Sequence, residues 1–390
     1  MKRIIRIFII IFFVINSLVS DSQGIDSLQN IQITISFSEA PTTFSVEKAP
    51  LRFNKTFAFS YQMDDGSKDI YTHGYPYFKG GMIDTTSYPG LKFTDGCGND
   101  LNFTMSSSLF SFSTNQPGGI DLHDPTSPYA IRYVTWPELN EMYKDGWGIS
   151  NHGLSSKVDG NYSDLIARNE SYVKLQTQAA TPGGVDMGIF VNPNGVEAFT
   201  PLAFDQGLLV CYREGYKFGV PSFDVNSVWD QQNIKMGRTN TYTRVNLSKL
   251  VDGIANASIE GANHWGVAFT HSIVNPSYGY AFSDFTEHMD YVANRYGKNG
   301  LDNIWMATEE EVLDYLLVTE AVSVSFELIN HQLQITFSGK IPSNYRFYNL
   351  SLLINADKPI ASITANGVTS FSFKGTGQQH ALINISWNER

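Results

Sequence analysis

The chain has few cysteines and few charged residues for its length. Of its 390 residues only two are cysteines, Cys97 and Cys211, and 17% are charged. A disulfide between them could form in an oxidising compartment, but they are far apart in the sequence, which does not show whether their Cα atoms come close enough. Basic residues are scarcer than acidic ones, 27 against 38, and the net charge is −11. This balance argues against nucleic acid or an anionic membrane surface as a partner.

Long apolar runs are also missing, except at the N-terminus. Lys2, Arg3 and Arg6 precede an apolar run over residues 7–15, and small residues follow it. This pattern is typical of a signal peptide, which we assign to residues 1–22. No later segment is apolar enough to cross a bilayer, so no stable membrane span is expected after cleavage. The sequence therefore predicts a secreted, periplasmic or cell-surface-associated protein.

The rest of the chain divides by its pattern of apolar residues into three parts. Residues 23–52 form an N-terminal β segment, in which strict alternation over residues 31–37 predicts a half-buried strand. Residues 53–318 alternate between strand-like and helical runs, which predicts an α/β fold with a parallel barrel or sheet. Within them, residues 67–129 are rich in Gly, Pro, Ser and aromatics and are predicted to be a long loop insertion. Residues 319–390 contain short β segments, which predict a small accessory β-sandwich.

The most informative segment is an apolar strand that ends in two adjacent acids and a glycine. The strand covers residues 57–63, and Asp64, Asp65 and Gly66 follow it. Two neighbouring carboxylates repel each other and need a cation, a shared proton or solvent. The carboxyl end of a buried strand is where α/β barrels place their chemistry. The alternative is a surface turn, because Asp-Asp-Gly is ordinary turn composition.

Two histidines lie in comparable positions after other predicted strands. His152 lies in a loop beside Gly153, after a short strand, and His271 ends the apolar strand that begins at Trp265. Without a functional role, His152 would be an exposed or backbone-bonded histidine, and His271 would be a core histidine with satisfied hydrogen bonds.

These segments, in this order, resemble the motifs of the polysaccharide deacetylases of carbohydrate esterase family 4, the NodB-homology domain. Residues 60–66 are similar to the family's Thr-Phe-Asp-Asp-Gly motif, residues 150–156 to its Gly-Asn-His-Thr-x-x-His motif and residues 268–271 to its Leu-x-His motif. The resemblance implies a distorted (β/α) barrel of the polysaccharide deacetylase type with a small C-terminal β-sandwich. The roles that it implies are Asp64 as general base, His271 as general acid, and Asp65 and His152 as ligands of a divalent metal ion, expected to be zinc.

The chain departs from the family pattern at two positions. Ser156 stands where the family has its second metal-binding histidine, and Val191 stands where the third motif has an arginine that orients the base. One His and one Asp are fewer than the three protein ligands of a catalytic zinc site. A displaced ligand such as His73, His123 or Asp159 could complete the site. Otherwise the metal keeps more waters, or catalysis has been lost.

The resulting functional prediction is a secreted, metal-dependent hydrolase that removes acetyl groups from an acetylated polysaccharide or peptidoglycan. The bond cleaved would be the C–N bond of an amide or the C–O bond of an ester. The alternative is a catalytically impaired carbohydrate-binding protein on the same fold. A lyase or glycosidase fits less well, because acids adjacent in sequence do not face each other across a glycosidic bond.

Overall fold

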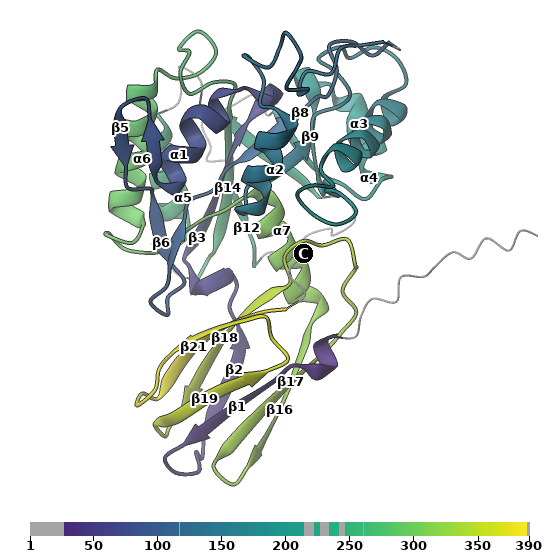
Figure 1. Ribbon diagram of the computed structural model, residues 1–390. Coiled ribbons are helices and arrows are strands. Elements are labelled where there is room, and N and C mark those ends of the chain that lie inside the picture. The colour runs from purple at the N-terminus through teal and green to yellow at the C-terminus, as the bar shows by residue number, and fades with distance from the viewer. Residues whose placement is uncertain are drawn as a thin grey trace, which may run out of the picture.

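The computed structural model consists of a strand barrel surrounded by helices and, beneath it, two antiparallel sheets (Figure 1). It describes residues 27–116, 118–213, 222–226, 234–241, 246–259 and 261–387. The predicted signal peptide, residues 1–22, lies outside the described residues.

Seven parallel strands close the barrel. In ring order they are β3 (Phe57–Met63), β8 (Ser106–Leu109), β9 (Gly148–Asn151), β10 (Ile189–Val191), β11 (Leu209–Arg213), β13 (Lys235–Asn240) and β14 (His264–Thr270). The ring closes because β14 pairs in parallel with β3 along the whole of β3. Two more strands extend the sheet: β15 (Ile304–Met306) runs parallel to the first half of β3, and β12 (Ser222–Asp224) runs antiparallel to β14. This architecture agrees with the predicted barrel and sandwich.

Helices cover the outside of the barrel. They are α1 (Tyr75–Lys79), α2 (Trp136–Lys144), α3 (Tyr162–Gln176), α4 (Thr200–Phe204), α5 (Leu247–Ala257), α6 (Phe282–Tyr296) and α7 (Glu309–Ala321). Helix α2 begins at a capping box, in which the Glu138 carboxylate accepts a hydrogen bond from the Thr135 backbone N–H at 2.8 Å. In the part of the chain that the structure describes, no helix is both long and apolar enough to span a bilayer.

Side chains of β3 alternate between the helical layer and the barrel interior. The rings of Phe57 and Tyr61 pack against aromatic residues of α6. On the other face, Ser60 accepts a hydrogen bond from Trp265 of β14, and Gln62 accepts one from Arg238 of β13. The alternation follows from the pleat of a strand. Because the inward-facing side chains Ser60 and Gln62 are polar, the interior beneath Asp64 is polar and can hold a buried carboxylate.

The predicted long loop over residues 67–129 is wrong. This segment contains a π-helix (Ile70–Gly74), α1, the hairpin strands β4 (Gly81–Ile83), β5 (Thr86–Tyr88), β6 (Lys92–Thr94) and β7 (Asp100–Asn102), and the barrel strand β8. The sequence of β8, Ser-Ser-Ser-Leu, shows no apolar alternation. Its strand conformation is stabilised instead by the polar interior, where Ser106 donates to Glu309 and Ser108 donates to Asp64.

The two antiparallel sheets beneath the barrel combine strands from both ends of the chain. One sheet has the order β16 (Ser323–Ile329), β17 (Gln332–Ser338), β1 (Gln32–Phe37), β19 (Ile360–Asn366), and the other has the order β2 (Phe44–Lys48), β18 (Asn349–Ala356), β21 (His380–Ser386), β20 (Ser370–Lys374). The apolar face of β1, with Ile33 and Ile35 buried, faces the core between the sheets. The N-terminal strands therefore complete the sandwich rather than standing apart from it.

A buried charged cluster joins the sandwich to the base of the barrel. The Arg346 guanidinium lies over the Tyr143 ring, 3.5 Å from its centroid, and donates to the Trp147 carbonyl at 2.9 Å. It also forms an ion pair with Glu310 of α7 at 3.3 Å. Asp314, one turn further along α7, accepts the backbone N–H of Arg346. These contacts fix the sandwich against α2 and α7.

The two cysteines are not paired. Cys211 is buried in β11, whereas Cys97 lies beside the Leu382 carbonyl of β21 in the sandwich. Burial raises the pKa of the Cys97 thiol to about 11, so it stays protonated at neutral pH.

Candidate active site

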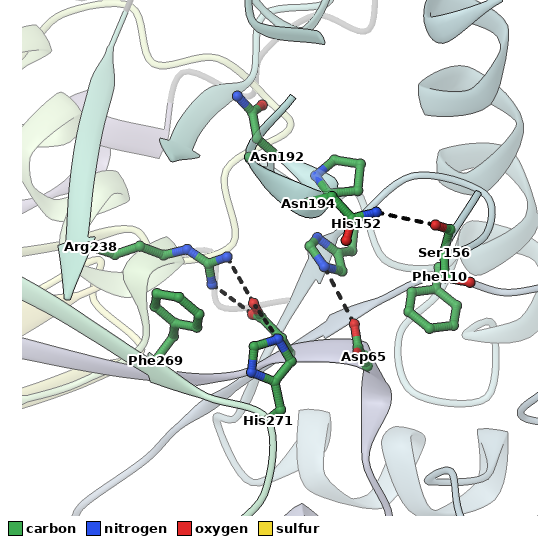
Figure 2. A pocket seen from close by; sticks show the side chains of 12 residues that line it. Asp65, Phe110, His152, Ser156, Asn192, Asn194, Arg238, Phe269 and His271 are labelled. Atoms are coloured by element: carbon green, nitrogen blue, oxygen red, sulfur yellow. Dashed lines mark hydrogen bonds and ion pairs between the residues drawn. The ribbon is translucent and has the colours of Figure 1, made fainter. Parts of the chain in front are cut away.

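The candidate residues after three different strands meet in one pocket at the mouth of the barrel (Figure 2). Asp64 and Asp65 follow β3, His152 follows β9 and His271 follows β14. They meet because the carboxyl ends of parallel barrel strands lie at the same rim. The pocket has a volume of about 140 Å³ and is also lined by Phe110, Ser156, Asn192, Pro193, Asn194, Gly195, Arg238 and Phe269.

The Asp64 side chain is buried, and hydrogen bonds fix both of its carboxylate oxygens. Its two carboxylate oxygens accept from Nη1 and Nη2 of Arg238 at 2.6 and 2.8 Å, and Oδ1 also accepts from the Ser108 hydroxyl at 2.5 Å. Burial alone would raise the pKa of Asp64, but the charge and hydrogen bonds of Arg238, together with the nearby His152 and His271, outweigh it and hold this pKa well below its usual range. Asp64 is therefore a carboxylate of fixed orientation at neutral pH.

The position of the third-motif arginine is Val191 in this chain, but an arginine from another strand, Arg238, pairs with Asp64. It comes from β13, is itself buried, and its guanidinium lies 3.8 Å from the centroid of the Phe269 ring. The motif arginine is absent at position 191, as the sequence indicates, and Arg238 is an arginine that the sequence analysis did not single out. No sequence pattern marks it, because β13 reads Lys-Met-Gly-Arg-Thr-Asn and shows neither a long apolar run nor a motif.

Asp65 and His152 form a second pair in the same pocket. His152 Nε2 lies 3.5 Å from Asp65 Oδ1, and His152 Nδ1 lies 2.8 Å from the Val191 carbonyl oxygen. Because a carbonyl oxygen only accepts, Nδ1 carries the proton when the ring is neutral and Nε2 presents its lone pair toward Asp65. His152 is buried, whereas the Asp65 side chain is 42% exposed and can be reached from solvent.

This pair fits a divalent cation. Burial alone would lower the pKa of His152, but Asp65 and Asp64 raise it, so the pocket is a place where positive charge is favoured. A carboxylate oxygen and an imidazole nitrogen are ordinary zinc ligands, and a ring N–H bonded to a backbone carbonyl is the usual support for such a histidine. Within the described residues, however, no three His, Cys, Asp or Glu side chains come together as a metal-binding group. A cation held by this pair would need any third protein ligand to be of another residue type.

None of the three displaced ligands considered from the sequence lines the pocket. Both ring nitrogens of His123 face backbone carbonyls, at 2.5 and 3.2 Å, in the core. His73 Nδ1 bonds to the neighbouring Thr72 hydroxyl, and its ring packs on Phe282. Asp159 accepts from Asn115 in an exposed loop. These residues do not complete the site.

His271 lies on the open side of Asp64. Its Nε2 is 4.0 Å from Asp64 Oδ2, and its side chain is 37% exposed. The loop after it is fixed to the turn after the paired acids, because Asp69 accepts from the Ser272 hydroxyl at 2.6 Å and from the Ile273 N–H at 2.7 Å. His271 can therefore contact both Asp64 and a ligand that enters from solvent.

Comparisons with known proteins include a weak structural likeness. No family model matches the chain, and a search of curated proteins gives no match. The Streptococcus pyogenes deacetylase PplD, solved in complex with acetate, is similar at 13% sequence identity and a TM-score of 0.26. The similarity covers 39% of this chain and 54% of that one, so the chain matches about half the length of that deacetylase. At this level the likeness assigns neither activity nor substrate.

Proposed function

We propose that the chain is an exported hydrolase that removes acetyl groups from a polysaccharide or peptidoglycan, with a divalent cation, zinc, held by Asp65 and His152. The observation that carries this proposal is the content of the pocket. A fixed carboxylate, Asp64, lies 4.0 Å from an accessible imidazole, His271, and both lie beside a carboxylate–imidazole pair. Acetyl hydrolysis needs an activated water, a proton acceptor and a proton donor, and the pocket has a candidate for each.

Asp65 and His152 are the residues that would hold the cation. When bound, a divalent cation in this position polarises an acyl carbonyl and lowers the pKa of a water. His152 is suited to this role because the Val191 carbonyl fixes its ring. Asp65 is suited because its carboxylate is open to the pocket.

Asp64 is placed to take the proton of the attacking water. The Arg238 fork and the Ser108 hydroxyl fix its orientation before substrate arrives, which saves reorganisation during the reaction. The low pKa of Asp64 keeps the carboxylate ionised at neutral pH, which is the form that can accept a proton. His271, on the solvent side, is placed to protonate the leaving nitrogen or oxygen.

The size of the pocket favours an acetyl group over a whole sugar ring. Its volume of about 140 Å³ is close to that of an engineered protein cavity of roughly 150 Å³ that holds one benzene molecule, which is smaller than a substituted sugar ring. We infer that only the acetyl group and the attacking water enter, while the sugar stays at the mouth. This arrangement suits a polymeric substrate, which cannot be enclosed.

Acetate release tests the proposal. The zinc-loaded chain is incubated with O-acetylated xylan, N-acetylated chito-oligosaccharides and peptidoglycan, and free acetate is measured. We expect release from at least one substrate, and its loss in Asp64→Asn and His271→Ala variants that keep the wild-type circular dichroism spectrum. Activity surviving in either variant would refute that residue's role. Glycan binding without acetate release from any substrate would favour the carbohydrate-binding alternative.

A further inference from the structure

We propose that Asn194 supplies the third protein ligand of the cation site, through its side-chain oxygen, in place of the histidine that is absent at position 156. This inference rests on the proposed cation at Asp65 and His152. Asn194 is not one of the residue types of the family pattern. It lies on the turn that follows β10, whereas position 156 lies on the loop that follows β9.

The orientation of the Asn194 amide follows from its hydrogen bond. Asn194 Nδ2 donates to the Ser156 backbone carbonyl at 3.3 Å. A carbonyl oxygen cannot donate, so the nitrogen must be the end that faces Ser156, and Oδ1 must be the other end. Figure 2 shows the Asn194 side chain with its nitrogen toward Ser156, and Asn194 and His152 line the same pocket. Among the described residues no donor bonds to this oxygen, which is therefore available to a ligand in the pocket.

The backbone around Asn194 holds it close to the His152 loop. Asn194 adopts a left-handed conformation, with φ of 54°, inside the short 3-10 turn Pro193–Gly195. Asparagine tolerates this conformation better than most residues. The same chain segment provides the Val191 carbonyl that orients His152, and a Cβ built at Gly153 would touch Pro193 at 3.7 Å. One turn thus both orients a predicted ligand and presents a second oxygen donor.

The donor set predicts how the site should discriminate among metals. Replacing an imidazole by a neutral amide oxygen leaves one nitrogen and two oxygen donors, which is a harder set than the family's. We expect weaker zinc binding than at a site with two histidines. The competing candidate is the Ser156 hydroxyl, because Ser156 also lines the pocket and its side chain occupies the expected position.

Metal titration of matched variants of the full chain separates these candidates. Co²⁺ binding is measured by calorimetry and by the visible absorption of the bound ion, which reports its ligands. Asn194→Gly removes the donor and keeps the turn, because glycine accepts a positive φ. Ser156→Ala removes the hydroxyl and keeps the backbone carbonyl. We expect Asn194→Gly to raise the Co²⁺ Kd by about tenfold or more and to change the absorption band. Ser156→Ala should leave the Co²⁺ Kd and the absorption band unchanged.

The outcomes also distinguish this inference from the proposed function. Asp65→Ala and His152→Ala are titrated alongside, with thermal unfolding to confirm that each variant is folded. If these two abolish Co²⁺ binding while Asn194→Gly binds like wild type, the role of Asn194 is refuted and the cation pair stands. If Ser156→Ala lost as much Co²⁺ affinity as Asn194→Gly, the assignment of Asn194 as the third ligand would likewise be refuted. If Asp65→Ala and His152→Ala bind like wild type, the cation site itself is wrong.

Discussion

Arg238 at the mouth of the barrel and Arg346 at its base are both buried, and each forms an ion pair with a carboxylate. Their surroundings differ. At the base, Arg346 also donates to main-chain carbonyls, and the nearby pocket holds Lys174 and Asp186, already paired with each other. No histidine is found in the described lining of that pocket.

At the mouth, by contrast, the ion pair is the fixed part of a pocket that also holds a second carboxylate and two imidazoles. The Asp65 side chain is 42% exposed, His152 presents Nε2 to it, and the His271 side chain is 37% exposed. A buried ion pair is therefore weak evidence for a site by itself, since it serves equally well to join two parts of a fold. What distinguishes the mouth is that coordinating atoms beside the pair face a pocket. The predictions below test this distinction.

The largest effect is expected on catalysis at the mouth. Asp64→Asn keeps the shape of the side chain but removes the proton acceptor, so kcat/KM for acetate release should fall by about 10²–10⁴-fold. Thermal unfolding shows whether the variant is folded. A variant that is folded and fully active would exclude Asp64 from the chemistry.

The largest effect on stability is expected at the base. Arg346→Met leaves Glu310 buried without its partner and removes hydrogen bonds to the Tyr143 and Trp147 carbonyls. We expect a loss of about 3–5 kcal/mol in the free energy of unfolding, measured in urea. Lys358→Met is the matched control, because Lys358 pairs with Glu39 at the surface, and it should change stability little. Equal losses in both variants would contradict the structural role of Arg346.

A smaller catalytic effect is expected at Arg238. Arg238→Lys keeps the charge but cannot contact both oxygens of Asp64 in a fork. We expect kcat to fall by about 10–100-fold with little change in KM, because Arg238 acts through Asp64 rather than on the sugar. Arg295→Lys, at an exposed position on α6, is the control. A change confined to KM would instead indicate that Arg238 binds substrate.

The smallest effect concerns Glu309, which lies inside the barrel between the two ends and accepts from Ser106. Burial raises the pKa of Glu309 from 4.5 to about 7. The folded protein therefore binds the Glu309 proton more tightly than the unfolded chain does. As a result, the free energy of unfolding falls as pH rises from about 4.5 to about 7 and is then constant. Glu309→Gln lacks this loss, and at pH 8 it should be more stable than wild type by about 1–3 kcal/mol. The gain should vanish near pH 4.5. A difference that is independent of pH in urea unfolding would contradict this account.

Much of the barrel could be predicted because its buried strands and capped helices leave local signals. The apolar run before Asp64 and the capping box of α2 are examples. The strands β8 and β13 escaped prediction because their inward-facing residues are polar and are satisfied only by partners far along the chain. The pairing of β1 with β17 and β19 is equally non-local, and nothing in residues 32–37 indicates the partner.

The candidate site was predictable to the extent that its residues end strands. Asp64 and Asp65 follow an apolar run, His271 ends another, and His152 follows a short predicted strand, so the pattern brings them to one rim. Arg238 lies within a strand and Asn194 lies on a turn of ordinary composition, so neither is marked in the sequence. Their place beside Asp64 and His152 comes from the closure of the barrel.

The most direct test of the central claim compares acetate release by Asp64→Asn and Arg346→Met at equal concentrations of folded, zinc-loaded protein. If the mouth is the catalytic centre and the base is a structural junction, Asp64→Asn loses nearly all activity while folded Arg346→Met keeps a rate close to wild type. If Asp64→Asn releases acetate at the wild-type rate, or if folded Arg346→Met loses as much activity as Asp64→Asn, the account is contradicted.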